Sequence, residues 1–171
     1  QKQETTSTWY GIFTEEGERT ETFDAVYYVW RGKEPEVKSP RLDSVKLDDK
    51  RATESIYLKA TEKYSAKAFV EDFGNKTVFD WSVVPESTDI QAGGDTEDAP
   101  EALYALVKKQ VNNTATIQAP KKEGAYRLFL YAKNAEKKVA YANIPFYVVP
   151  NPDATTGSVQ LKKRTLNPVY E

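Results

Sequence analysis

The sequence has 171 residues, of which 39% are hydrophobic and 29% charged, with a formal net charge of −2. This balance suits one soluble globular domain with a short extension. It excludes a large basic field for nucleic acid or anionic membrane. The chain has no cysteine and no histidine, so disulfides, thiolate or imidazole metal ligands, and Ser-His or Cys-His nucleophiles are excluded. No apolar run approaches the ~20 residues of a membrane span.

Residues 1–37 predict a strand, a loop, a helix and part of a linker. The apolar run WYGIF at residues 9–13 is the expected strand. Thr20 is expected to cap a helix that Gly32 ends. Apolar residues of this helix recur with helical spacing at Phe23, Val26, Tyr27 and Trp30. We expect this stripe to pack against a neighbouring domain or a partner surface, and Tyr28, which lies off the stripe, to be exposed.

The ends of this helix carry further signals. Glu21 and Asp24 fall in its first turn, where the helix dipole favours negative charge. The segment GKEPEVKSP at residues 32–40 is charged and contains two prolines. We interpret it as a linker on this composition.

Residues 38–150 predict an immunoglobulin-like antiparallel β-sandwich of seven or eight strands, so the fold class is mainly β. Short runs alternate apolar and polar residues, with turn residues between them. Strands are expected near residues 42–47, 55–60, 64–71, 77–84 and 113–119, and a short helical turn within 102–109. Residues 151–171 are expected to form a tail with one possible strand at 159–161.

The most distinct signal is a hairpin over residues 124–149, in which two apolar runs flank a polar turn. Period-two alternation predicts that one face of this hairpin lies in the core. That face comprises Tyr126, Leu128, Leu130, Ala132, Ala140, Ala142, Ile144, Phe146 and Val148. Lys137 and Lys138 are expected to keep the turn in water and to protect the hairpin edge.

Aromatic residues are the candidates for ligand contact. Trp81 lies among apolar neighbours of a strand, and a core position with a partnered N–H is favoured over a sugar-stacking platform. Sugars bind flat aromatic faces with a few polar groups to orient them. The residues proposed for such contact are Trp9, Tyr28, Tyr57, Tyr104, Tyr131 and Tyr141.

Carboxylates are the candidates for metal binding. Residues 85–100 form a polar, acidic insertion, and oxygen ligands suit calcium. Its spacing matches no EF-hand, so a solvated acidic loop is favoured, and catalysis is rejected because paired carboxylates need rigid elements. No cofactor is expected, with calcium the one metal considered. Its candidate ligands are Asp72, Asp89, Asp95 and Asp98.

Several segments resemble a known kind of protein. WYGIF, TETFDAVYYVWRGKEP and SPRLDSVKLDDK, followed by WSVVPESTDIQAGGDTEDAP, EGAYRLF and ANIPFYV, are similar to the end of secreted Bacteroidetes glycoside hydrolases related to family 2. There, the last strand and helix of a TIM barrel lead into an immunoglobulin-like module. This module also resembles polycystic-kidney-disease-type domains, whose Asp-rich turn precedes the Trp strand. Here that turn reads DFGNK, and its single carboxylate and its lysine disfavour calcium.

The resemblance implies a non-catalytic accessory module of an exported polysaccharide-degrading enzyme, with the catalytic residues upstream of this chain. On that basis we expect no enzymatic activity of this chain alone. The expected partners are a polysaccharide or the catalytic domain, with no nucleic acid and no membrane span. The expected location is the periplasm, the cell surface or the extracellular space. A carbohydrate-binding module with an aromatic platform, and a structural spacer or protein-interaction domain, remain the alternatives.

Overall fold

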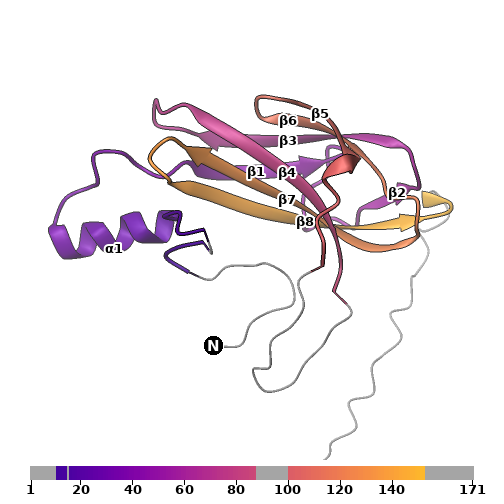
Figure 1. Ribbon diagram of the computed structural model, residues 1–171, viewed down its shortest axis with the longest axis horizontal. Coiled ribbons are helices and arrows are strands. Elements are labelled where there is room, and N and C mark those ends of the chain that lie inside the picture. Colours follow the sequence, from indigo (N-terminus) through magenta and orange to yellow (C-terminus); the bar gives the residue numbers. More distant parts are fainter. Residues whose placement is uncertain (1–10, 15, 88–99, 153–171) are drawn as a thin grey trace, which may run out of the picture.

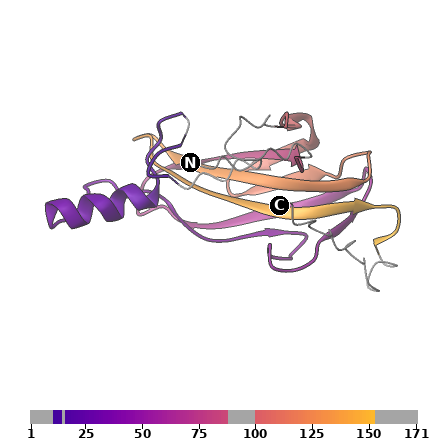
Figure 2. The same cartoon turned by 90° about the horizontal axis from the view of Figure 1, so that it is seen from below.

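The computed structural model describes residues 11–14, 16–87 and 100–152. Two four-stranded sheets face each other as a β-sandwich, and a helix extends from one end of it (Figures 1 and 2). The predicted mainly β sandwich with an N-terminal helical segment is therefore confirmed. Trp9, Asp89, Asp95, Asp98 and the possible strand at 159–161 lie outside the described residues.

The first four strands of the described chain alternate between the two sheets, and the last four form one hairpin in each sheet. In chain order the elements are α1 (Glu21–Arg31), β1 (Arg41–Leu47), β2 (Tyr57–Lys59), β3 (Lys63–Glu71), β4 (Thr77–Pro85), the 3-10 helix η1 (Tyr104–Leu106), β5 (Val107–Val111), β6 (Thr114–Gln118), β7 (Gly124–Asn134) and β8 (Val139–Val149). One sheet has the order β1-β3-β6-β5 and the other β2-β8-β7-β4.

One strand departs from the expected antiparallel arrangement. The short strand β2 runs parallel to β8, with Tyr57 opposite Tyr147. The backbone N–H of Tyr147 donates to the carbonyl of Ile56. Because Ile56 and Leu58 are both buried, β2 is held at this edge by core packing as well as by its few hydrogen bonds.

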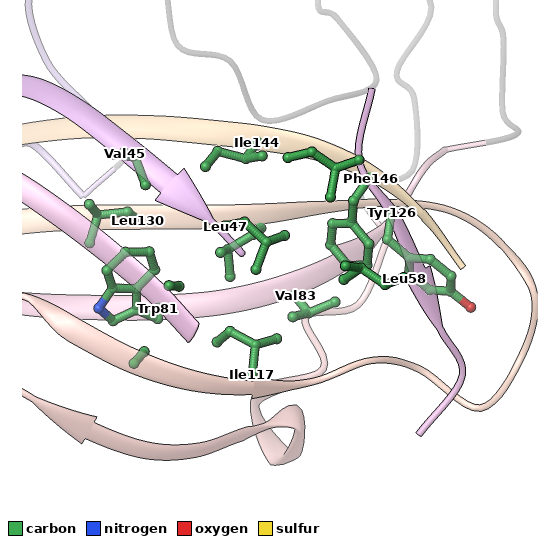
Figure 3. Packing of buried hydrophobic residues seen from close by; sticks show 14 of the residues in the cluster. Val45, Leu47, Leu58, Trp81, Val83, Ile117, Tyr126, Leu130, Ile144 and Phe146 are labelled. Carbon is green, nitrogen blue, oxygen red and sulfur yellow. The ribbon is translucent and has the colours of Figure 1, made fainter. Parts of the chain in front are cut away.

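The hairpin β7–β8 has the predicted inward face. Its strands pair in register, with Leu128 opposite Ile144 and Leu130 opposite Ala142. Leu130 and Ile144 lie in one buried cluster with Val45, Leu47 and Ile117 of the other sheet, as Figure 3 shows. The largest fully buried side chains are Trp81, Phe146, Leu47, Ile56, Leu58, Ile117, Leu128, Leu130, Ile144, Val83, Val139 and Val148.

Trp81 occupies the core position that its strand predicts. It is 1% exposed and lies between the sheets (Figure 3). The expectation that its indole N–H finds a partner is wrong within the described residues, where Nε1 has none. The indole is thus held by packing, because burial of its large ring outweighs one unmade hydrogen bond.

Candidate functional site: helix α1 and its anchor

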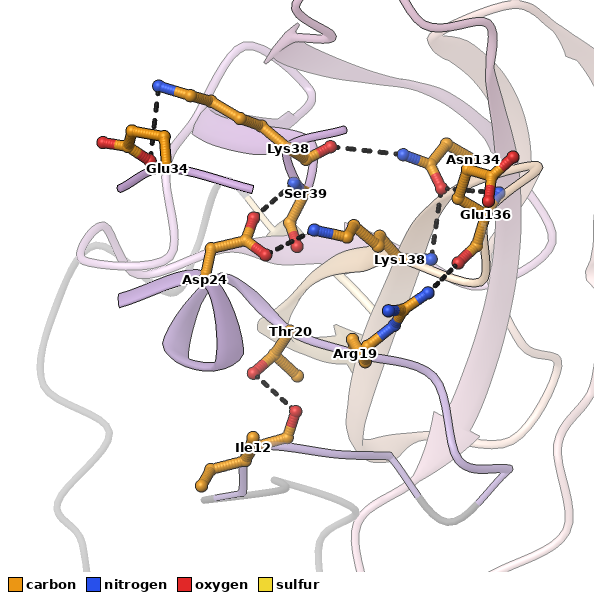
Figure 4. Close-up of polar contacts among 10 residues, drawn as sticks. All are labelled: Ile12, Arg19, Thr20, Asp24, Glu34, Lys38, Ser39, Asn134, Glu136 and Lys138. Carbon is orange, nitrogen blue, oxygen red and sulfur yellow. Dashed lines mark hydrogen bonds and ion pairs between the residues drawn. The ribbon is translucent and has the colours of Figure 1, made fainter. Parts of the chain in front are cut away.

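Helix α1 begins and ends where the sequence predicts. Thr20 is its N-cap residue, and Gly32 ends it in the left-handed conformation at φ 67°, where its N–H donates to the carbonyl of Tyr28 at 2.8 Å. The Thr20 hydroxyl makes no capping bond. It donates instead to the carbonyl of Gly11 at 3.0 Å and to that of Ile12 at 3.2 Å, the second of which Figure 4 shows. Thr20 therefore ties the start of the helix to the segment before it.

A buried ion pair joins α1 to the β7–β8 turn. Lys138 Nζ lies 2.5 Å from Asp24 Oδ1, and the backbone N–H of Ser39 donates to Asp24 Oδ2 at 2.5 Å (Figure 4). Lys138 is 3% exposed and Asp24 8%. The expectation that Lys138 keeps the turn in water is wrong, because the turn folds against the helix and the ammonium group meets a carboxylate there. Asp24 was expected to interact with the helix dipole, and in the structure it also forms an ion pair with Lys138.

Asn134 and Arg19 complete this contact. The Asn134 side-chain oxygen accepts from the N–H groups of Glu136 and Lys138, at 3.0 and 3.1 Å, and its amide donates to the carbonyl of Lys38 at 3.3 Å. The Arg19 guanidinium donates to the carbonyl of Glu136 at 2.8 Å, and the Arg19 backbone bridges to the same turn. We call the set Arg19, Asp24, Ser39, Asn134 and Lys138 the helix anchor (Figure 4).

Aromatic contacts support the anchored half of α1. The ring of Phe23 lies 5.6 Å from that of Phe13 and 6.3 Å from that of Tyr27, measured between centroids. The Arg19 guanidinium carbon lies 5.4 Å from the Phe23 centroid, which is within cation–π range. The first two turns of α1 are thus fixed by charge, hydrogen bonds and ring contacts together.

The second half of α1 leaves the sandwich. Trp30 is 80% exposed, Val29 76% and Tyr28 52%. Exposure of Tyr28 agrees with its position off the predicted stripe, and Trp30, predicted on the stripe, does not pack against the sandwich. The physical reason is visible in Figure 2, where α1 projects beyond the end of the sheets and only its first turns lie beside them.

One side of α1 is apolar and points away from the anchor. Residues four, seven and eight positions after Thr22 lie on the same side of a helix as Thr22 itself. We call the set Thr22, Val26, Val29 and Trp30 the α1 face. Val26 is half-buried and the other three are exposed. Large apolar side chains gathered on one exposed side of a rigid element are a feature of interaction sites.

The structure does not bring the predicted sugar-contact residues together. Tyr131 and Tyr141 form one cross-strand pair, with centroids 6.2 Å apart, and Tyr57 stacks on Tyr147 at 5.9 Å. Tyr28 lies on α1, and Tyr104, in η1, is 61% exposed. The described candidates are therefore spread over separate elements rather than over one aromatic platform.

Arg127 and Tyr131 of the hairpin are engaged within the molecule. Arg127 donates to both carboxylate oxygens of Glu86, at 2.8 and 3.2 Å, and to Asn143 at 2.8 Å. Burial raises the pKa of Tyr131. Burial opposes the charge on the neighbouring Lys133, yet ionic hydrogen bonds to the carboxylates of Glu18 and Glu16 outweigh it and raise the pKa of Lys133.

The one described metal candidate has a structural role. Asp72 Oδ1 accepts the backbone N–H of Gly74 at 3.0 Å, a local turn bond of the kind that Asp favours. Within residues 11–14, 16–87 and 100–152, no group of three or more His, Cys, Asp or Glu side chains could hold a metal ion. The same part of the chain contains no helix long and apolar enough to cross a bilayer.

Sequence reasoning missed the helix anchor. Asp24 is one acidic residue in a first turn, and Lys138 is one of two lysines in a hairpin turn. Neither pattern distinguishes a buried partner from a solvated charge, because their contact joins residues 114 positions apart. The spacing of Phe23 and Tyr27 did indicate an apolar side of α1, without indicating how far that side is covered.

Comparison with known proteins gives a likeness of fold. No protein-family model and no curated protein matches the chain. Among solved structures, CopC from Methylosinus trichosporium OB3b matches with 12% identity and a TM-score of 0.33, covering 64% of this chain and 92% of that one. PcoC, a copper resistance protein from Escherichia coli, matches with 18% identity and a TM-score of 0.35, covering 64% and 99%.

These matches correct the predicted function. The accessory module of a polysaccharide-degrading enzyme was expected, but the two solved structures named above are CopC and a copper resistance protein. A copper site does not transfer to this chain either. Protein copper sites draw mainly on Cys, His and Met ligands, and the sequence has none of the three.

Proposed function

We propose that this chain is a protein-docking module in which the sandwich is a rigid support and the α1 face is the contact surface. The observation that carries the proposal is the contrast along one short helix. Its first turns are fixed by the buried Asp24–Lys138 pair, whereas Val29 and Trp30 are 76% and 80% exposed. The proposal involves neither a glycan nor an enzyme.

The physical case rests on pre-organisation. A helix that is already ordered loses little conformational entropy when a partner binds it. Apolar residues on one side of such a helix fit the mode in which a helix lies in a partner's groove. Trp and Tyr are also the residues that contribute most at protein interfaces. Trp30 of the α1 face is such a residue.

The proposal is tested by photo-crosslinking in cells that produce the protein. A benzophenone amino acid replaces Thr22, an exposed residue of the α1 face, and in a matched control replaces Val111, an apolar residue of β5 that is 53% exposed. We expect a discrete protein adduct from position 22, lost when Val29→Asp is added, and no such adduct from position 111. Equal adducts from both positions, or none from position 22, would overturn the proposal.

A further inference from the structure

We propose that the N-terminal part of the described chain is a strap, which opens from the sandwich as one piece while the sandwich stays folded. The strap comprises residues 11–14 and 16–38 and includes α1. Because an 11-residue helix is marginal without the contacts that fix it, opening also releases the order of α1. This conformational change belongs to the chain by itself and occurs with or without a partner on the α1 face.

The apolar core does not extend into the strap. Among the described residues, the buried cluster between the sheets begins at Val45, and Leu42 is the first half-buried residue packed against it. The rings of Phe13, Phe23 and Tyr27 lie near one another, all within the strap. Burial of apolar surface is the dominant favourable force in folding. That force joins the two sheets to each other and leaves the strap outside.

Polar groups form the joint between the strap and the sandwich. Within the described residues, the buried polar and charged side chains other than Ser82 all belong to the strap or to residues bonded to it: Thr14, Thr20, Asp24, Ser39, Asn134 and Lys138. The Asp24–Lys138 pair is the charged part of this set (Figure 4). Desolvation of both charges offsets most of the attraction in a buried ion pair. The joint can therefore open at a lower cost than the core.

Two further contacts of the strap meet the same end of the β7–β8 hairpin. Lys133 Nζ lies 2.7 Å from Glu18 Oε1 and 3.3 Å from Glu16 Oε2. The carbonyl of Arg19 accepts the backbone N–H of Val139 at 2.9 Å. Because these contacts and the buried pair lie at one end of one hairpin, opening breaks them together. It also uncovers the backbone of β8 at Val139.

Contacts inside the strap keep it in one piece. The Thr20 hydroxyl donates to the carbonyls of Gly11 and Ile12, and the Thr14 hydroxyl donates to Glu18 Oε2 at 2.9 Å. Regions with few buried apolar contacts open locally, in roughly contiguous cooperative units. A disturbance at one contact of the joint therefore spreads through the whole strap.

Amide hydrogen exchange of the whole chain, resolved by NMR in rising sub-denaturing urea, tests the strap. We expect the protected amides of α1 and the N–H of Arg19 to share one opening equilibrium. Their protection factors should be at least about tenfold lower than those at the centre of β7 and β8, which open only when the domain unfolds. Equal protection of α1 and of these strands would overturn the proposal.

Coupling across the joint is the sharper test. Lys133→Met removes contacts with two glutamates that precede α1, and it should speed exchange about tenfold along the whole of α1. Lys138→Met removes the buried pair and should speed exchange about a hundredfold in α1 and also at Arg19. Arg127→Met is the matched control, because it removes an ion pair with Glu86 from the same strand as Lys133. It should leave exchange in α1 unchanged.

Two results with these variants would also overturn the proposal. A rise with Lys133→Met that is confined to residues 16–18 means that each contact acts locally. An equal rise in α1 with Arg127→Met means that exchange there follows the stability of the whole domain. Circular dichroism checks that each variant keeps the sandwich, and if Lys138→Met does not, Lys133→Met still decides. The crosslink at position 22 is read separately, so failure of the strap and failure of the docking function are distinguishable.

Discussion

Trp81 and Trp30 place the same side chain in two opposite environments. Trp81 is 1% exposed between the two sheets, and Trp30 is 80% exposed on α1. In the sandwich, apolar side chains from both sheets pack against each other and bury the Trp81 ring. On α1, the ordering comes from the helix anchor, in which charge and hydrogen bonds are the main contacts. The fold thus separates the residues that stabilise it from the residues available to a partner.

This contrast shows how a small domain can hold an apolar surface in water. A helix of 11 residues is marginal on its own, and hydrophobic packing alone would draw its apolar side against the sheets. The Asp24–Lys138 pair instead fixes the first turns, and Gly32 ends the helix before the chain returns to β1. Tyr28, Val29 and Trp30 stay exposed, and the helix that carries them projects beyond the end of the sheets (Figure 2).

The largest effect is expected in the core. Trp81→Ala should lower the free energy of unfolding by about 3–5 kcal/mol, because it removes a large ring and leaves a cavity between the sheets. Urea denaturation followed by circular dichroism measures the loss. Trp81→Phe keeps most of the volume and serves as the control, with a smaller loss. A cost for Trp81→Ala below about 1 kcal/mol would mean that the core collapses around the gap.

The second effect concerns the helix anchor. Lys138→Met should cost about 3 kcal/mol, because it leaves the Asp24 carboxylate buried with the N–H of Ser39 as its remaining donor among the described residues. Hydrogen exchange of the α1 amides should rise with it. Urea denaturation measures the loss of stability, and mass spectrometry measures the hydrogen exchange.

The control for this effect is the double variant Asp24→Asn with Lys138→Met. It removes both charges and keeps an oxygen that accepts from Ser39, so it should recover a large share of the lost stability. If the double variant is as unstable as the sum of the single variants, the two residues are not coupled. The stability that the helix anchor contributes would then come from its other hydrogen bonds.

Much of this fold could be predicted from the sequence, because its signals are local. Period-two alternation identified the inward face of β7–β8, and Thr20 and Gly32 marked the ends of α1. The parallel pairing of β2 was not predicted, since three residues of strand carry no information on direction. The burial of Lys138 and the exposure of Trp30 were missed for a related reason. Both depend on where α1 lies relative to the sandwich, which helical spacing does not specify.

The third effect is loss of stability at high pH. Burial raises the pKa of both Tyr126 and Tyr131, and contacts with Glu18 and Glu16 raise that of Lys133. The folded state then holds these protons more tightly than the unfolded state, whose groups titrate at about 10 to 10.4. Their contribution is complete below pH ~10 and is lost as pH rises through the folded pKa values.

Urea midpoints measured across this alkaline range check the sign. Tyr131→Phe removes one of the three groups and should flatten the fall of the midpoint with pH, while Tyr28→Phe, on exposed α1, should not. A midpoint that rises above pH 10 would contradict the direction of all three shifts.

The smallest effect on stability is expected at Trp30, and it tests the contrast between Trp30 and Trp81 most directly. Trp30→Ala should change the free energy of unfolding by no more than about 0.5 kcal/mol in dilute solution, because an exposed side chain loses little contact when it is truncated. Urea denaturation under the conditions used for Trp81→Ala gives the paired measurement. A loss at Trp30 close to that at Trp81 would mean that the tryptophan of α1 stabilises the fold, and its exposure would then no longer indicate a surface reserved for a partner.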